Sequence, residues 1–330
     1  MPIAFIFERE NSMKAPVVMF GYNRLELQSM VMKCFSECEG AAERDIFVFL
    51  DGPRKNLDNV ESDKIKNMLE GYKTKMFPRM RIIKRERNYG CRENIVQGIT
   101  DVLEKYGRAI VIEDDILVSK TFLTFMDSAL DFYEGDKRIW CINGFQKYIF
   151  KLPKDYKHDV YLAYTNCAWG WATWQNRWAQ VDFDMRDYPD YIKSPANVKK
   201  LNEVSYILKT LLDSQYRGTL KAWDAQCWFH MVKNDLYAIE PKYQMSKNIG
   251  CIPNSEHYSS VDPFMLTQKF YNFMPRLEHG LPLDERILRQ FKYCALNPNV
   301  FVRLWRKVWR MVVGLIQKPC YVPVDAVDRV

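Results

Sequence analysis

A chain of 330 residues with 48% hydrophobic and 14% aromatic residues can bury a large core, which excludes an intrinsically disordered protein. The formal net charge of +7 suits anionic small molecules or an anionic membrane surface, and without a basic motif it gives no support for nucleic acid as a partner. The nine cysteines are scattered, so we expect reduced thiols and no zinc site.

Strand and helix patterns alternate through the first third of the chain. After residues 1–13, expected to form a loose leader, short apolar runs predict buried strands over 16–20, 46–50, 80–83 and 109–112. Amphipathic or polar helices are predicted between them over 25–38, 58–76 and 92–105. This alternation is typical of an α/β fold with a mainly parallel sheet flanked by helices.

The second half of the chain is less regular. We predict helices over 121–133, over about 197–216 and from Trp223 onward, and strands over 138–142, 160–164 and 237–241. A loop rich in Gly, Ser and Asn is expected over 246–260, and the tail from about 262 is predicted to be helical. The chain is thus expected to divide into an α/β domain over 14–260 and a helical C-terminal extension over 261–330.

Three consecutive carboxylates, Glu113, Asp114 and Asp115, directly follow the strand over 109–112. Burial of three ionised carboxylates is unfavourable unless a cation meets them, so we expect them at the ligand-binding edge of the sheet. Mg²⁺ and Mn²⁺ prefer oxygen ligands of this kind. The alternative is an acidic turn at the N-terminus of a helix that starts around Ser119.

Polar residues also follow the other predicted strands, among them Arg24, Asp51 and Arg92. Because the carboxyl ends of parallel strands meet at one edge, we expect these side chains near the acidic triplet. A divalent cation on Asp115 with arginines around it suits a diphosphate, which predicts a nucleotide-diphosphate site. For the two arginines, the alternative is ordinary surface charge near helix N-termini.

Seven short segments resemble segments of a known family and occur in the same order as in that family. They are Pro16-Val17-Val18 through Arg24, Leu50-Asp51-Gly52, Val111 to Ile116, Trp140 to Gly144, Gly170-Trp171-Ala172, Trp223-Asp224 and Ser255-Glu256-His257. Over roughly 14–260 the chain resembles the GT-A glycosyltransferases, in detail the inverting N-acetylglucosaminyltransferase I group and bacterial capsule and O-antigen sugar transferases. The resemblance implies a Rossmann-like sheet and a nucleotide-sugar donor, most simply a UDP-sugar.

The resemblance also implies roles for the residues at the edge of the sheet. Asp115, the last residue of the DxD-like triplet, would bind Mn²⁺ or Mg²⁺ on the donor diphosphate. Asp114 would contact the ribose or the sugar, and Glu113 completes the donor-binding set or is structural. Arg24 and Asp51 would flank the nucleotide, with Asp51 on a uracil-type base.

Later segments would supply the remaining parts of the site. Asp224 would be the catalytic base, although some relatives carry a second acid where this chain has Ala225. For Asp224 the alternative is an acid at the start of a helix. The loop with Ser255 and His257 would close over the donor phosphates, with His257 as a second metal ligand, a phosphate donor or an exposed histidine.

Three tryptophans, Trp169, Trp171 and Trp174, lie within six residues. Tryptophan is more often used in cores. Three tryptophans separated by a glycine are nevertheless more than one core layer needs. We therefore predict that Trp169 and Trp171 stack on an acceptor sugar.

The tail over about 299–318 predicts a basic amphipathic helix with Trp305 and Trp309. Such helices lie in membrane interfaces, and the alternative is a helix packed on the catalytic domain. We find no secretory signal and no stretch of 18 apolar residues, so we expect a cytoplasmic protein held at the inner face of the membrane. A lipid-linked glycan acceptor would fit that location.

The sequence therefore predicts a metal-dependent, inverting hexosyl- or N-acetylhexosaminyltransferase that acts on a glycan hydroxyl. A sugar-1-phosphate nucleotidyltransferase is one alternative, although Gly21-Tyr22-Asn23-Arg24 is not the glycine-rich loop that such an enzyme needs. A non-catalytic carbohydrate-binding protein that uses the tryptophans is another, and it would ignore both metal and nucleotide.

Overall fold

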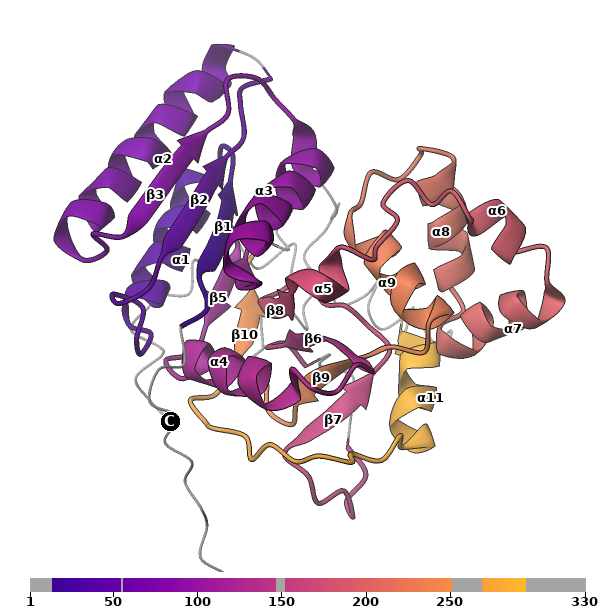
Figure 1. The fold of residues 1–330 in the computed structure, drawn as a ribbon. Helices are drawn as coiled ribbons and strands as arrows, with labels where there is room; N and C mark the ends of the chain where they lie inside the picture. Colours follow the sequence, from indigo (N-terminus) through magenta and orange to yellow (C-terminus); the bar gives the residue numbers. More distant parts are fainter. Residues whose placement is uncertain (1–13, 55, 147–151, 251–268, 295–330) are drawn as a thin grey trace, which may run out of the picture.

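The computed structural model describes residues 14–54, 56–146, 152–250 and 269–294. Three predictions lie outside the described residues: the leader over 1–13, the loop residues Ser255 and His257, and the helix over 299–318. Figure 1 shows a sheet with helices on both of its faces and a group of short helices, α6 to α9, beside it.

The first half of the chain folds as its sequence predicts. Its elements are β1 (Val17–Gly21), α1 (Leu25–Ser36), β2 (Ile46–Leu50), α2 (Asn56–Lys75), β3 (Met80–Lys84), α3 (Gly90–Tyr106) and β4 (Arg108–Ile112). These bounds confirm the alternation read from the sequence, with shifts of a few residues at element ends.

The second half contains β5 (Ile116–Val118), α4 (Phe122–Tyr133), β6 (Ile139–Asn143), β7 (Val160–Ala163), β8 (Trp171–Trp174), α5 (Gln175–Trp178), α6 (Tyr188–Tyr191), α7 (Pro195–Val204), α8 (Leu208–Tyr216), α9 (Asp224–Lys233), β9 (Tyr237–Pro241), β10 (Ser246–Asn248) and α11 (Glu285–Cys294). The expected strands over 138–142, 160–164 and 237–241 are confirmed as β6, β7 and β9.

Three predictions for the second half were wrong. The helix over 197–216 is two helices, because the backbone is extended at Ser205, between α7 and α8. The loop over 246–260 begins with β10, which pairs with β5. Residues 269–284 are not helical; Pro275 and Pro282, which cannot donate a backbone hydrogen bond, stand in that stretch, and α11 begins only at Glu285.

The main sheet has the strand order β3-β2-β1-β4-β8-β6-β9-β7. Strands β1 to β4 are parallel, and β8 is antiparallel to both β4 and β6. Among the described strands, four of the seven pairings in this sheet are parallel. The predicted α/β class with a mainly parallel sheet flanked by helices is thus confirmed, with a more mixed second half than the sequence indicated.

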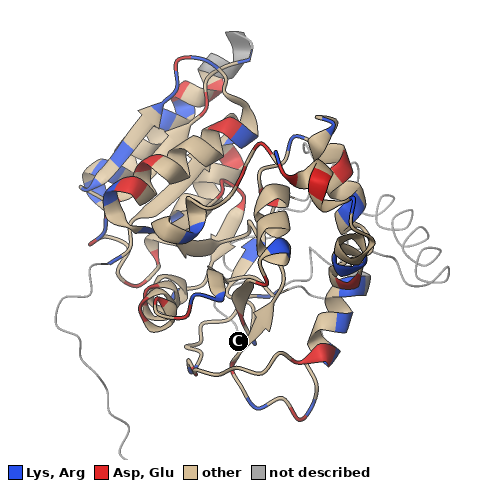
Figure 2. Cartoon of the chain, turned by 45° about the vertical axis from the view of Figure 1, so that its right-hand side comes forward, with Lys and Arg blue, Asp and Glu red and all other residues tan. Residues whose placement is uncertain are grey.

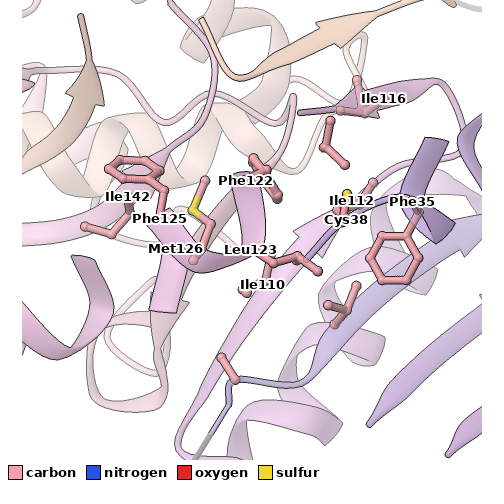
Figure 3. Packing of buried hydrophobic residues seen from close by; sticks show 14 of the residues in the cluster. Phe35, Cys38, Ile110, Ile112, Ile116, Phe122, Leu123, Phe125, Met126 and Ile142 are labelled. Atoms are coloured by element: carbon pink, nitrogen blue, oxygen red, sulfur yellow. The ribbon is translucent and has the colours of Figure 1, made fainter. Parts of the chain in front are cut away.

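The sheet separates two apolar clusters because side chains alternate along each strand. Val17 and Met19 of β1 face one cluster, and Val18 and Phe20 face the other. Helices α1, α2 and α4 cover the first face, whereas α3, α9 and α11 contribute to the second. Figure 3 shows the first cluster where side chains of α1 and α4 pack beside β4. The ends of the central strands are therefore held rigidly from both sides.

Charged side chains are interspersed on the surface. Figure 2 shows Lys and Arg alternating with Asp and Glu over the described helices and loops in this view. Many are paired, as Arg79 is with Asp45 at 2.8 Å between Nη2 and Oδ2. Among the helices that the structure describes, none has the length and apolar composition that a membrane crossing requires.

Candidate functional site

The loops after β1 and β4 diverge at the centre of the sheet. From β1 the chain moves outward to β2 and β3, and it then returns to place β4 on the opposite side of β1. In open α/β sheets, ligands bind beyond the carboxyl ends of the strands at such a point of reversal. Arg24 follows β1 and the acidic triplet follows β4, so both lie at this position.

Arg24 contacts two carboxylates of the triplet directly. Its Nε donates to Asp114 Oδ2 at 3.1 Å, and its Nη1 donates to Asp115 Oδ2 at 3.0 Å. Its Nη2 also donates to Asp114 Oδ1. Asp114 is 6% and Asp115 9% exposed, whereas the Arg24 side chain is 36% exposed. The structure thus brings together three residues that the sequence placed separately at this edge.

The triplet carries more negative charge than Arg24 balances. Burial raises the pKa of Glu113 well above its usual value, and the charges of Asp115, Asp114 and Asp224 add to that effect. Burial also raises the pKa of Asp114 to about 6, against the opposing charge of Arg24. Burial opposes the charge of Arg24 as well, but the two aspartates outweigh it and raise the pKa of the guanidinium. Such a cluster favours a further cation.

Asp224 is more than 100 residues from the triplet in sequence, yet its charge contributes to the raised pKa of Glu113. A stack of tryptophans holds the start of its helix in place. Trp223, directly before Asp224, stacks on Trp171 of β8 with ring centroids 5.5 Å apart. Trp171 in turn pairs with Val111 of β4, two residues before Glu113. The start of α9 is therefore fixed beside the end of β4.

The chain after β9 packs on Asp115. Strand β10 pairs with β5, and beyond it Ile249 N donates to the carbonyl oxygen of Asp115 at 2.8 Å. Asn248 Nδ2 lies 3.5 Å from Asp115 Oδ1. The segment that leads to Ser255 and His257 thus starts at the triplet. Sequence reasoning missed Asn248, because a three-residue strand leaves no periodic signal.

Gly250 lies so close to Asp115 that a Cβ there would approach Oδ2 to 2.0 Å and Cγ to 2.7 Å. We expect Gly250→Ala to displace the Asp115 carboxylate and to weaken divalent-metal binding about tenfold or more. Calorimetric titration with Mn²⁺ in the presence of UDP or GDP measures this effect. Gly71→Ala is the matched control, because a Cβ at Gly71 meets nothing within 4 Å. Equal Mn²⁺ affinity of the two variants would contradict the prediction.

The Asp51 carboxylate accepts four hydrogen bonds from nearby residues. Its Oδ1 accepts hydrogen bonds from the backbone N–H groups of Gly52 and Tyr89, both at 2.8 Å. Its Oδ2 accepts from Asn88 Nδ2 and from Gly90 N, both at 2.9 Å. The carboxylate thus ties the end of β2 to the start of α3. A nucleotide base would have to displace one of these four donors.

Arg92 makes its contacts with the loop between α5 and α6. Its Nη2 donates to the carbonyl oxygen of Phe183 at 2.7 Å and lies 3.7 Å from Asp184 Oδ1. Phe183 itself packs on Trp178. Arg92 therefore links α3 to the loop between α5 and α6, which is a structural contact.

The tryptophans predicted to bind acceptor behave differently from one another. Trp171 has no exposed surface and stacks between Trp140 and Trp223, so its side chain belongs to the core. Its assignment to an acceptor sugar was therefore wrong, because the sheet buries β8 at its centre. Trp169 is only partly buried and packs edge-on against Phe145 at 4.5 Å. It remains a candidate for contact with a sugar.

The residues present fit a divalent cation that binds through substrate phosphates. Within the described ranges, no group of three or more His, Cys, Asp or Glu side chains is arranged to hold a metal ion by itself. Mg²⁺ in phosphate sites is usually held by one or two carboxylates and the phosphates. Asp114 and Asp115 supply hard oxygen ligands of that kind.

Comparison with known proteins gives distant structural likenesses. No protein-family model matches the sequence, and no curated protein matches it. The chain is similar to S. aureus TarS in complex with UDP, at 11% identity and a TM-score of 0.42, over 77% of this chain and 62% of that one. It is also similar to the mannosyltransferase PcManGT from Pyrobaculum calidifontis in complex with GDP-Man and Mn²⁺, at 10% identity and a TM-score of 0.35.

The match to the mannosyltransferase covers 49% of this chain and 45% of that one. A third likeness is to the galactosyltransferase LgtC with donor and acceptor sugar analogs, at 10% identity and a TM-score of 0.36, over 68% and 72% of the two chains. The chain thus spans less than two thirds of the length of TarS and PcManGT. At these scores the likeness is too distant to assign an activity.

Proposed function

We propose that this chain is a metal-dependent, inverting glycosyltransferase of the GT-A type, similar to the N-acetylglucosaminyltransferase I group. It would transfer a hexosyl or N-acetylhexosaminyl group from a nucleotide diphosphate sugar, most simply a UDP-sugar, to a glycan hydroxyl. One observation carries the proposal: Arg24, Asp114 and Asp115 meet at the point of reversal of the sheet, with Asp224 beside them. This combination offers a cation site, a phosphate-binding arginine and a separate carboxylate.

The donor end of the site follows from the charges. Asp115 and Asp114 would hold Mn²⁺ or Mg²⁺, and Arg24 would bind the diphosphate through its planar fork of N–H groups. When bound, the cation would neutralise the charge that develops on the departing diphosphate. His257 is proposed as a further ligand, and Ser255 as a phosphate contact.

The acceptor end is built around Asp224. An inverting transfer needs one carboxylate that takes the proton from the attacking hydroxyl. Asp224 is proposed for this step because the stack of Trp223 on Trp171 fixes the start of α9 beside the end of β4. Trp169 is proposed to contact the acceptor glycan, which would belong to bacterial surface polysaccharide or glycolipid synthesis. The tail over 299–318 would bring the protein to a membrane-linked acceptor.

A donor screen tests the proposed function. The purified chain is incubated with UDP- and GDP-sugars and Mn²⁺, and release of the nucleotide is measured. We expect slow hydrolysis of one donor that stops when EDTA removes the metal and returns when Mn²⁺ is added back. Pyrophosphate release from a sugar-1-phosphate and a nucleotide triphosphate would instead indicate a nucleotidyltransferase. Sugar binding that ignores metal and nucleotide would indicate a carbohydrate-binding protein.

A further inference from the structure

We propose that Arg24 is an internal counter-cation that keeps free divalent metal off Asp114 and Asp115, so that the site takes up metal and nucleotide diphosphate together as one complex. This inference rests on the proposed function and concerns how the same site selects its ligand. The ligand that the structure favours is neither the free metal nor the free nucleotide.

The geometry of Arg24 supports this role. One guanidinium spans two consecutive carboxylates, with Nε and Nη2 on Asp114 and Nη1 on Asp115. Both aspartates are nearly buried, while the arginine is partly open to solvent. The cation therefore occupies the carboxylate oxygens that a metal ion would need, and it is the partner with room to move.

Electrostatics predicts different affinities for the free metal, the free nucleotide diphosphate and the complex of the two. Free metal must break a partly buried, hydrogen-bonded ion pair and separate Arg24 from the two aspartates, which is unfavourable. Free nucleotide diphosphate brings negative charge toward Asp114 and Asp115 and is repelled. When the metal–diphosphate complex binds, the aspartates would bind the metal and Arg24 would bind the phosphate oxygens, so each charged group keeps a partner of opposite charge.

The test compares Arg24→Met and Arg24→Lys with the wild-type chain by calorimetric titration with Mn²⁺ alone, UDP or GDP alone, and each nucleotide with Mn²⁺. We expect Arg24→Met to bind Mn²⁺ alone about tenfold tighter and the Mn²⁺–nucleotide complex about tenfold weaker than wild type. Arg24→Lys should fall between them, because it keeps the charge and loses the fork.

Arg79→Met is the matched control. Arg79 pairs with Asp45 through the same two-bond geometry, at 3.2 and 2.8 Å, but at the amino ends of β2 and β3. This variant should bind every ligand as the wild-type chain does. Melting temperatures provide a second readout: Arg24→Met should melt lower than wild type without metal and gain more on addition of Mn²⁺.

The Mn²⁺ affinity of Arg24→Met tests the counter-cation role, and nucleotide binding by the wild-type chain tests the proposed function. If Arg24→Met shows no gain in Mn²⁺ affinity, or loses affinity for every ligand, the counter-cation role is overturned. If Arg24→Met gains Mn²⁺ affinity but the wild-type chain binds no nucleotide with or without Mn²⁺, the counter-cation role stands and the proposed function is overturned.

Discussion

Replacement of Asp115 by alanine is expected to abolish metal-dependent nucleotide binding, with a loss of about 100-fold or more in affinity for the Mn²⁺–nucleotide complex. Asp115 lies at the point where the sheet reverses; Arg24 and Asn248 contact its carboxylate, and Ile249 N donates to its carbonyl oxygen. Its removal would leave Asp114 as the only remaining carboxylate of the proposed pair of metal ligands. Calorimetric titration with Mn²⁺ and UDP or GDP measures the loss.

Asp45→Ala is the control for this variant, because Asp45 also pairs with an arginine, at the opposite edge of the sheet. We expect Asp45→Ala to bind the complex as the wild-type chain does. An Asp115→Ala variant that remains folded and binds Mn²⁺–nucleotide with wild-type affinity would show that the metal site lies elsewhere.

Replacement of Asp224 is expected to leave donor binding intact and to lower turnover by about 10²- to 10⁴-fold, the usual contribution of a general base. The proposed metal and phosphate contacts are those of Asp114, Asp115 and Arg24, so the loss of Asp224 is expected to leave them in place. Binding is measured by titration with Mn²⁺–nucleotide, and turnover by release of the nucleotide from the donor found in the screen.

The choice of substitution separates catalysis from helix stabilisation. Asp224 stands in the first turn of α9, where an acid stabilises a helix by about 1 kcal/mol or less at an exposed site. Asp224→Asn keeps the size of the side chain and one acceptor oxygen, but it replaces the other oxygen with an NH2 donor and cannot accept the proton. Full turnover in Asp224→Asn would rule out the base assignment, whereas loss in both Asp224→Asn and Asp224→Ala supports it.

Local periodicity was sufficient to predict the first half of the fold. The apolar runs that became β1, β2 and β4 are short and continuous because these strands are buried on both faces, whereas β3, at the edge of the sheet, is only partly buried. Helical patterns separate the four strands in the sequence. Since parallel strands share one carboxyl edge, the sequence also placed Arg24 and the acidic triplet together at that edge.

Only the tertiary structure decided which residues at that edge contact one another. Asp51 and Arg92 follow predicted strands or start predicted helices just as Arg24 does, yet Asp51 ties two loops together and Arg92 holds the Phe183 carbonyl oxygen. Position along a strand fixes the edge on which a side chain lies, but hydrogen-bond partners depend on the paths of the neighbouring loops.

The sequence by itself determined the α/β class and the acidic and basic groups at the centre of the site. The tertiary structure decided that Trp171 is a core residue, that Asp224 lies beside Glu113 and that Asn248 and Gly250 pack on Asp115. The physical reason is distance along the chain: β8 pairs with β4, and β10 with β5, across 60 residues or more. Local periodicity does not reveal which distant strands pair. For the same reason, the tryptophan pattern of β8 is compatible with both a buried strand and a sugar-binding surface.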